Sequence, residues 1–300
     1  MTVYRTVTAA ALSALLVCAP AAGFGTQLPA AHAGDLAQVV GADERVAPAG
    51  EQAVITEGHI DIGAHLDGTQ ADLLARDDSQ PQPVWRRGED VVYVLGDTAL
   101  QTLPAGNDYS FVGAQEGAQV WVVPQTEVAG VPWIGWNTQA PSLVAAADRG
   151  VRMSFLGHSG PGEFSLFLQN GGFEPPQLLW STVAAGEDSL WVDLHTHTHA
   201  NWTFTEPGVH QVGLRVTVPL ANGSEVTADH ILTFAVGSSA TTPPDIAAAQ
   251  AAQWDPAAAA TGPGQGLPGW LIWVGGGAAA VVLVVLLGMF ARRKGAGDEL

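Results

Sequence analysis

Short runs rich in β-branched and aromatic side chains, some of them with alternating apolar and polar residues, fill the middle of the chain. Such alternation is typical of strands that bury one face, and turn sequences such as those at 160–162 and 222–223 separate the runs. A helical pattern is considered only around residues 70–75. Many short strands with frequent turns predict an all-β fold, specifically an immunoglobulin-like β-sandwich. The clearest strands are expected at 91–95, 119–123, 164–168, 190–194, 212–218 and 231–236.

Residues 202–236 carry the clearest of these patterns. Turn sequences at 206–208 and 222–223 divide this segment into three strands, as in the last strands of an immunoglobulin-like sandwich. The alternation weakens around Pro141–Ala147. The β-rich region 51–237 is therefore expected to be either one domain or two β-rich halves.

The first 33 residues have the composition of a secretory signal peptide. Arg5 precedes an apolar run at 9–20, and small residues then lead to Ala-His-Ala at 31–33, which matches an A-x-A cleavage site. We therefore expect residues 1–33 to be removed on export. The only cysteine, Cys18, lies in this segment, so the exported protein is expected to fold without disulfides.

A second apolar segment lies near the C-terminus. Residues 270–290 carry no charge, and a helix of this length spans about 30 Å, the thickness of a bilayer core. Tryptophans occur at its outer end, and three basic residues follow it at 292–294. Because basic residues stay in the cytoplasm, we expect a single-pass helix at 270–291, a cytoplasmic tail at 292–300 and an extracellular N-terminal domain.

The segments that flank the β-rich region differ from it in composition. Residues 34–50 are rich in Ala, Gly and acidic residues, and we expect them to be loose. Residues 238–269 are dominated by Ala, Pro and Gly, without apolar periodicity. This composition predicts a stalk that separates the β-rich domain from the membrane.

The chain is strongly acidic. It has 11 Lys and Arg residues against 29 Asp and Glu residues, a net charge of −18, and residues 34–269 hold seven arginines against 27 acidic residues, or −20. Such a surface repels a phosphate backbone, which argues against nucleic-acid binding, and favours cations as ligands. The 47% hydrophobic content excludes a uniformly disordered chain.

Histidines at every second position form the clearest candidate site. In a strand, His195, His197 and His199 would point to one face together with Asp193, with neighbours about 6–7 Å apart. Two imidazoles at that spacing can bind one cation about 2 Å from each nitrogen, and His197 and His199 are the primary candidates. The alternative is a polar Thr/His strand exposed to water.

Two other places offer metal-ligating side chains. His59 and Asp61 share one face of a predicted strand, and this donor pair suits Zn²⁺ or Mn²⁺, although an ordinary edge strand is the alternative. His158 lies in a glycine-rich loop, from which it could reach a site or serve as an ordinary turn residue. The sequence leaves open whether these residues meet His197 and His199 in space.

Catalytic motifs are weak in this sequence. Residues 157–161, Gly-His-Ser-Gly-Pro, resemble the start of a nucleophile elbow, Gly-x-Ser-x-Gly, but Pro161 replaces the final glycine and the strand-to-helix context is missing. Phosphate loops, dinucleotide fingerprints and His-Glu-x-x-His are absent from the sequence. We therefore expect a protein that is not an enzyme.

Residues 197–208, His-Thr-His-Ala-Asn-Trp-Thr-Phe-Thr-Glu-Pro-Gly, resemble a repeat of actinobacterial surface-anchored proteins with the hallmark H-x-H-x-N-W-x-F-T-x-P-G. Segments 56–61, 120–125 and 133–136 are similar to the choice-of-anchor M domain of the same proteins. The resemblance covers roughly residues 54–236. It implies a location at the cell surface and, as partners, components of ABC-type importers associated with metal ions.

Two functions are consistent with these patterns. In the first, the protein is anchored in the membrane, binds a divalent transition metal outside the cell and serves an ABC-type metal importer. Its candidate ligands are His197, His199, His195, His59, Asp61 and His158. In the alternative, the protein is an adhesion or scaffold module of the cell envelope without a metal, and exposed tryptophans form its partner surface. The chain has 10 tryptophans, among them Trp133, Trp136 and Trp202.

Overall fold

The computed structural model describes residues 38–256, apart from residues 170, 172, 173, 188 and 239. The predicted signal peptide, transmembrane helix and cytoplasmic tail lie outside these residues. Within the described part, no helix is both long enough and apolar enough to cross a bilayer. The membrane-targeting segments therefore stay predictions.

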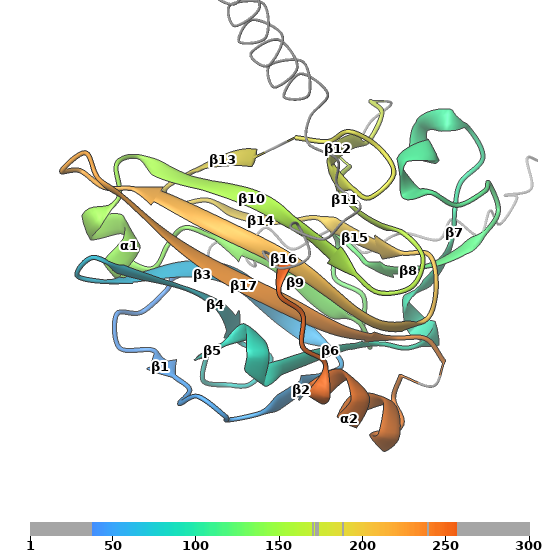
Figure 1. Ribbon diagram of the computed structural model, residues 1–300, viewed down its shortest axis with the longest axis horizontal. Coiled ribbons are helices and arrows are strands. Elements are labelled where there is room, and N and C mark those ends of the chain that lie inside the picture. Colours follow the sequence, from blue (N-terminus) through green and yellow to red (C-terminus); the bar gives the residue numbers. More distant parts are fainter. Residues whose placement is uncertain (1–37, 170, 172–173, 188, 239, 257–300) are drawn as a thin grey trace, which may run out of the picture.

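Strands in the described residues are arranged in three sheets (Figure 1). The first sheet has the spatial order β1 (Arg45–Val46), β5 (Val84–Arg86), β4 (Gln70–Asp77), β3 (Gly58–Asp67), β9 (Pro132–Asn137) and β14 (His197–His199). The second has the order β13 (Ser189–Asp193), β10 (Gly150–Ser159), β16 (Gly208–Pro219), β17 (Glu225–Val236), β6 (Val91–Leu95) and β2 (Ala53–Ile55). The third has the order β12 (Gln177–Ser181), β11 (Phe164–Leu168), β15 (Asn201–Phe204), β8 (Gln119–Val123) and β7 (Leu100–Thr102).

One hydrophobic core holds the three sheets together. Ile60 of the first sheet, Leu214 of the second and Phe204 of the third all belong to it, and each is 0% exposed. Full burial of one such side chain contributes about 1.5–3 kcal/mol to stability. The predicted all-β fold is confirmed, with a sandwich-like packing of sheets around this core.

The sequence patterns located most strands correctly, but the pattern at residues 70–75 was assigned to the wrong type of element. Each of the six expected strands coincides with or overlaps an observed one: β6, β8, β11, β13, β16 and β17. The turn at 222–223 closes the long β16–β17 hairpin, with Gly223 in the left-handed region at φ 85°. The helical pattern at 70–75 is wrong, because these residues form β4. Residues 73–77 are all buried, so the strand lacks the alternation that would have identified it.

Short helices fill the connections. They are the 3₁₀ helices η1 (Gly88–Asp90), η2 (Asp97–Ala99) and η3 (Asn107–Val112), and the α-helices α1 (Pro141–Ala146) and α2 (Pro243–Ala251). Helix α1 lies where the alternation weakens, and its Leu143 is buried in the shared core.

Helix α2 lies in the segment expected to be a stalk. Its Ala249 and Ile246 pack with Val92, Val94 and Ala235 of the second sheet. Trp254 follows and lies against Gly213, where an added side-chain carbon would be 3.2 Å from its ring. The first part of the expected stalk is therefore docked on the β-rich unit.

Candidate metal centre

Strand β9 lies between β3 and β14 in the first sheet. Asp61 of β3 and His199 of β14 are both paired with Gly135 of β9. His59 and His197 lie two residues away on these strands, so all four side chains share one face. Strands that flank a third strand are about 9–10 Å apart, and the four side chains reach toward one another over β9.

Four donor atoms converge at this place. The Nε2 atoms of His59, His197 and His199 are 2.9–3.1 Å from one another. A carboxylate oxygen of Asp61 lies 3.1 Å from Nε2 of His197, and the other lies 3.7 Å from the two remaining Nε2 atoms. Nitrogen ligands about 2.0–2.1 Å from a tetrahedral Zn²⁺ are about 3.3–3.4 Å apart, so movements of a few tenths of an ångström would admit an ion.

Gly135 makes this convergence possible. A side-chain carbon at this position would lie 2.5 Å from the Thr198 carbonyl oxygen, 2.8 Å from His199 Nδ1 and 2.9 Å from Asp61 Oδ1. All three distances are shorter than van der Waals contact, so only glycine fits between the two outer strands here. The cluster therefore occupies the space that a side chain on β9 would otherwise fill.

Burial and charge set the protonation states of the ligands. The side chains of Asp61, His197, His199 and His59 are 0%, 2%, 3% and 16% exposed. Burial lowers the pKa of His199 to about 3, although the charge of Asp61 opposes this shift. Burial raises the pKa of Asp61. The hydrogen bond from His197 and the charges of the three neighbouring imidazoles lower it by more than burial raises it, so the net shift is downward. His199 is therefore neutral and Asp61 ionised, the states in which both can bind a metal.

His59 behaves differently. Burial lowers its pKa, but the hydrogen bond to Asp78 and the charges of Asp61 and Asp78 outweigh burial, so the net shift is upward. Its Nδ1 donates to Asp78 Oδ1 over 2.8 Å. With the proton on Nδ1, the neutral ring presents the lone pair of Nε2 to the centre.

The hydrogen bonding of Asp61 also favours a bound cation, in addition to the distances between the donor atoms. Asp61 Oδ2 accepts a hydrogen bond of 3.2 Å from Asn137 Nδ2, whereas Oδ1 is buried without a hydrogen-bond partner. A buried ionised oxygen without a partner costs free energy, which a bound cation would remove. Three imidazole nitrogens and one carboxylate, without a thiolate, form a donor set that suits Zn²⁺ or Mn²⁺.

Sequence reasoning missed the residues that shape and orient the centre. Trp133, Gly135 and Asn137 alternate along β9 and therefore share the face that carries the ligands. Trp133 stacks on the ring of His199, with centroids 3.9 Å apart and planes at 16°. The Trp-x-Gly-x-Asn spacing was a usable signal, but it gained meaning only when β9 was known to lie between β3 and β14. No sequence pattern around Asp78 indicates that it would contact His59.

His195 lies outside the cluster, contrary to the expected run of histidines on one strand face. The chain leaves β13 at Asp193 and turns before β14 begins, with His195 in the left-handed region at φ 63°. The Oγ1 atoms of Thr138 and Thr196 donate to the Asp193 carbonyl oxygen over 2.6 and 2.7 Å and stabilise this turn. Because of this turn, the side chain of His195 is exposed to solvent and lies outside the cluster that contains His197.

His158 also lies outside the cluster. Its Nε2 is 2.9 Å from Nδ1 of His210, whose Nε2 donates to the Glu206 carbonyl oxygen over 3.0 Å. Burial lowers the pKa of both histidines to about 4. The pair packs beside Phe164 and Phe204, so His158 is a neutral, partly buried strand residue of β10 rather than a ligand carried by a loop.

Three of the tryptophans considered for the scaffold function are buried, whereas Trp191 is 46% exposed. Trp133, Trp136 and Trp202 are 6%, 5% and 1% exposed, because they lie on buried strand faces. The prediction that these three form a partner surface is wrong.

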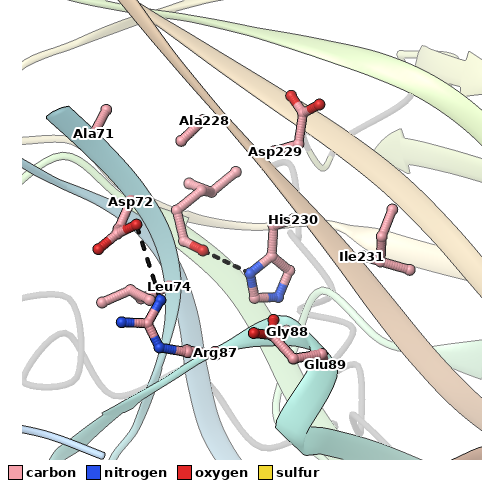
Figure 2. A pocket seen from close by; sticks show the side chains of 11 residues that line it. Ala71, Asp72, Leu74, Arg87, Gly88, Glu89, Ala228, Asp229, His230 and Ile231 are labelled. Atoms are coloured by element: carbon pink, nitrogen blue, oxygen red, sulfur yellow. Dashed lines mark hydrogen bonds and ion pairs between the residues drawn. The ribbon is translucent and has the colours of Figure 1, made fainter. Parts of the chain in front are cut away.

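Another concave place lies between β4, η1 and β17 (Figure 2). This cavity has a volume of about 250 Å³. At its wall, His230 Nδ1 donates to the Leu73 carbonyl oxygen over 2.7 Å, and Nε2 has no hydrogen-bond partner. Gly88 packs over that nitrogen, since a side-chain carbon there would lie 3.0 Å from it. His230 is therefore a neutral histidine of the interior, whose pKa is lowered by burial.

No family model, curated protein or solved structure matches this chain. The interpretation of the cluster therefore depends on its own geometry. The resemblance to surface-anchored proteins stays a prediction from short motifs.

Metal affinity is expected to fall with falling pH. The proton competes with the ion for Nε2 of His59, and because the pKa of His59 is raised, competition begins above pH 6.5 and strengthens as pH falls. His199, with a pKa of about 3, adds no competition in that range. Displacement of one proton weakens binding about tenfold per pH unit. Zn²⁺ titrations between about pH 5 and 8 measure this slope, and equal affinity across that range would contradict the assignment of His59.

Proposed function

We propose that the protein is a non-enzymatic surface protein, anchored in the membrane, that binds one divalent transition-metal ion outside the cell. The observation that carries this proposal is the convergence of four donor atoms, from His59, Asp61, His197 and His199, within 4.8 Å of one another. The two pairs are more than 130 residues apart in sequence. Only the pairing of β3 and β14 on either side of β9 joins them.

The chemistry of the ligands supports a divalent ion of intermediate softness. Imidazole and carboxylate together are typical of Zn²⁺ sites and also bind Mn²⁺, whereas Cu⁺ prefers thiolates and thioethers. Water-rich oxygen sites preferred by Ca²⁺ and Mg²⁺ contain few or no imidazoles. Zn²⁺ is expected to bind more tightly than Mn²⁺, which follows the general order of affinities for divalent metals.

The location and the partner are inferred from the sequence. The signal-peptide pattern, the apolar segment at 270–291 and the basic tail support export and anchoring by one helix. The resemblance to actinobacterial surface-anchored proteins supports delivery of the ion to an ABC-type metal importer. The strong negative charge of residues 34–269 would also attract cations to this surface.

The scaffold function has less support. Trp133, Trp136 and Trp202, which were named for its surface, are buried in the structure. Trp191 is the exposed tryptophan of the described residues, and one such ring makes only a small partner surface.

Isothermal titration of the full chain in detergent with Zn²⁺ and Mn²⁺ tests the proposal. The wild-type protein is expected to bind one Zn²⁺ per chain, and the double variant His197→Ala/His199→Ala is expected to lose the heat of binding. His195→Asn is the matched control, because His195 is exposed and asparagine tolerates its left-handed backbone conformation. Equal heats for the wild type and the double variant would show that the ion binds elsewhere.

A further inference from the structure

The ligands of the centre differ in their access to solvent. The side chains of Asp61, His197 and His199 are at most 3% exposed, whereas that of His59 is 16% exposed. The side chain of Asp78, which contacts the outer nitrogen of His59, is 21% exposed. The solvent side of the centre is therefore the edge formed by His59 and Asp78.

Asp78 is held firmly in this position. Its Oδ2 accepts hydrogen bonds from Arg76 Nη1 over 2.6 Å and from Gln38 Nε2 over 3.1 Å, while Oδ1 accepts from His59. Arg76 in turn donates twice to the carboxylate of Glu44, each time over 2.8 Å. The orientation of the His59 ring thus depends on a chain of ionised groups that reaches the segment before β1.

The two buried imidazoles lack such a partner. The Nδ1 atoms of His197 and His199 are buried without a carboxylate partner, and the backbone of Ile134 is the hydrogen-bonding group that raises the pKa of His199 against burial. Packing holds these rings instead, as in the stacking of Trp133 on His199. A carboxylate on the outer nitrogen orients an imidazole ligand and increases its basicity, so Asp78 strengthens the one ligand that solvent reaches.

The charges around the centre match a divalent ion. With neutral imidazoles, the carboxylates of Asp61, Asp78 and Glu44 and the guanidinium of Arg76 together carry a net charge of −2. A divalent cation would make this partly buried group of charges neutral, which removes the cost of burying unbalanced charge. The carboxylate chain behind His59 is therefore part of the environment of the ion.

We propose that the ion enters and leaves the centre past His59. Asp78 is the positioning residue that keeps the His59 ring turned toward the ion. This inference rests on the proposed metal-binding function. Release begins when the Nδ1–Asp78 hydrogen bond breaks and the His59 ring turns toward solvent. Asp61, His197 and His199 then hold the ion alone, with one side open to water or to an acceptor.

The release rate tests this proposal. The full chain is loaded with Zn²⁺ in detergent, and the transfer of Zn²⁺ to excess EDTA is followed for the wild type, Asp78→Asn, His59→Ala and the double variant. Asp78→Asn removes the charge and keeps the size of the side chain, and release is expected to be about 10–100-fold faster with unchanged stoichiometry. Asp229→Asn is the matched control, because Asp229 lies on β17 in an exposed ion pair with Arg215.

The variant without His59 separates positioning from general destabilisation. In the His59→Ala background, adding Asp78→Asn is expected to accelerate release much less than it does when His59 is present, since Asp78 acts chiefly by orienting His59. If Asp78→Asn releases Zn²⁺ at the wild-type rate, or accelerates release equally without His59, the positioning role is wrong while metal binding stands. If the wild-type protein retains no Zn²⁺, both the proposed function and this inference are wrong.

Discussion

Gly135→Ala is expected to abolish metal binding at the centre, with affinity for Zn²⁺ reduced by at least about 100-fold. The new methyl group would lie 2.8 Å from His199 Nδ1 and 2.9 Å from Asp61 Oδ1, so both ligands must move. It would also lie 2.5 Å from the carbonyl oxygen of Thr198, which belongs to the backbone of β14. We expect the metal-free protein to lose about 1–3 kcal/mol of stability, as is typical for overpacked positions. Zn²⁺ titration and urea unfolding measure the two effects.

Gly96→Ala is the matched control for this variant. Gly96 has an extended backbone conformation at φ −81° and ψ −166°, and a side-chain carbon there would lie 3.6 Å from the nearest atom, in ordinary contact. It should bind Zn²⁺ as the wild type does. If Gly135→Ala also bound Zn²⁺ with unchanged affinity, the ion could not lie between β3 and β14.

Zn²⁺ is expected to raise the thermal midpoint of the wild-type protein strongly. A ligand that binds only the folded state at about 1,000 times its Kd stabilises that state by about 4 kcal/mol. For a domain of this size, this corresponds to an increase of about 8–16 °C. The ion would join β3 and β14, which lie far apart along the chain, so that unfolding must break its coordination. Differential scanning calorimetry with and without Zn²⁺ measures the shift.

The double variant His197→Ala/His199→Ala provides the comparison. It removes two ligands from β14 and leaves His59 and Asp61, which are too few for tight binding. Its midpoint should change by no more than a few degrees on addition of Zn²⁺. A shift as large as that of the wild type would show that Zn²⁺ stabilises the protein from another site.

Much of the fold could be predicted from local patterns. Short runs rich in β-branched and aromatic residues, bounded by turn sequences, located β6, β8, β11, β16 and β17. This pattern failed at β4, where residues 73–77 are buried on both faces and resemble a short helical run. The docking of α2 was not predictable, because its alanine-rich sequence shows no clear apolar face and depends on contact with the second sheet.

All four residues of the cluster were among the candidates predicted from the sequence, together with two that lie outside it. His197, His199, His59 and Asp61 were identified because alternate strand residues share a face. His195 followed the same spacing but lies in a turn, since threonine side chains bind the carbonyl of Asp193 and interrupt the strand.

The meeting of the two pairs required tertiary structure. No local pattern indicates that β9 lies between β3 and β14, or that Gly135 leaves the necessary space. The same holds for Asp78, which reaches His59 from the loop that follows β4. The spacing of residues along the chain identifies candidate ligands, whereas the order of the strands in the sheet determines which of these ligands lie at one centre.

Anomalous diffraction at the zinc edge from crystals of the Zn²⁺-loaded protein tests the central claim most directly. The account predicts a single strong peak about 2.0–2.1 Å from Nε2 of His59, His197 and His199, with a carboxylate oxygen of Asp61 as the fourth ligand. A peak bound by other residues, with these three imidazoles still in contact with one another, would contradict it.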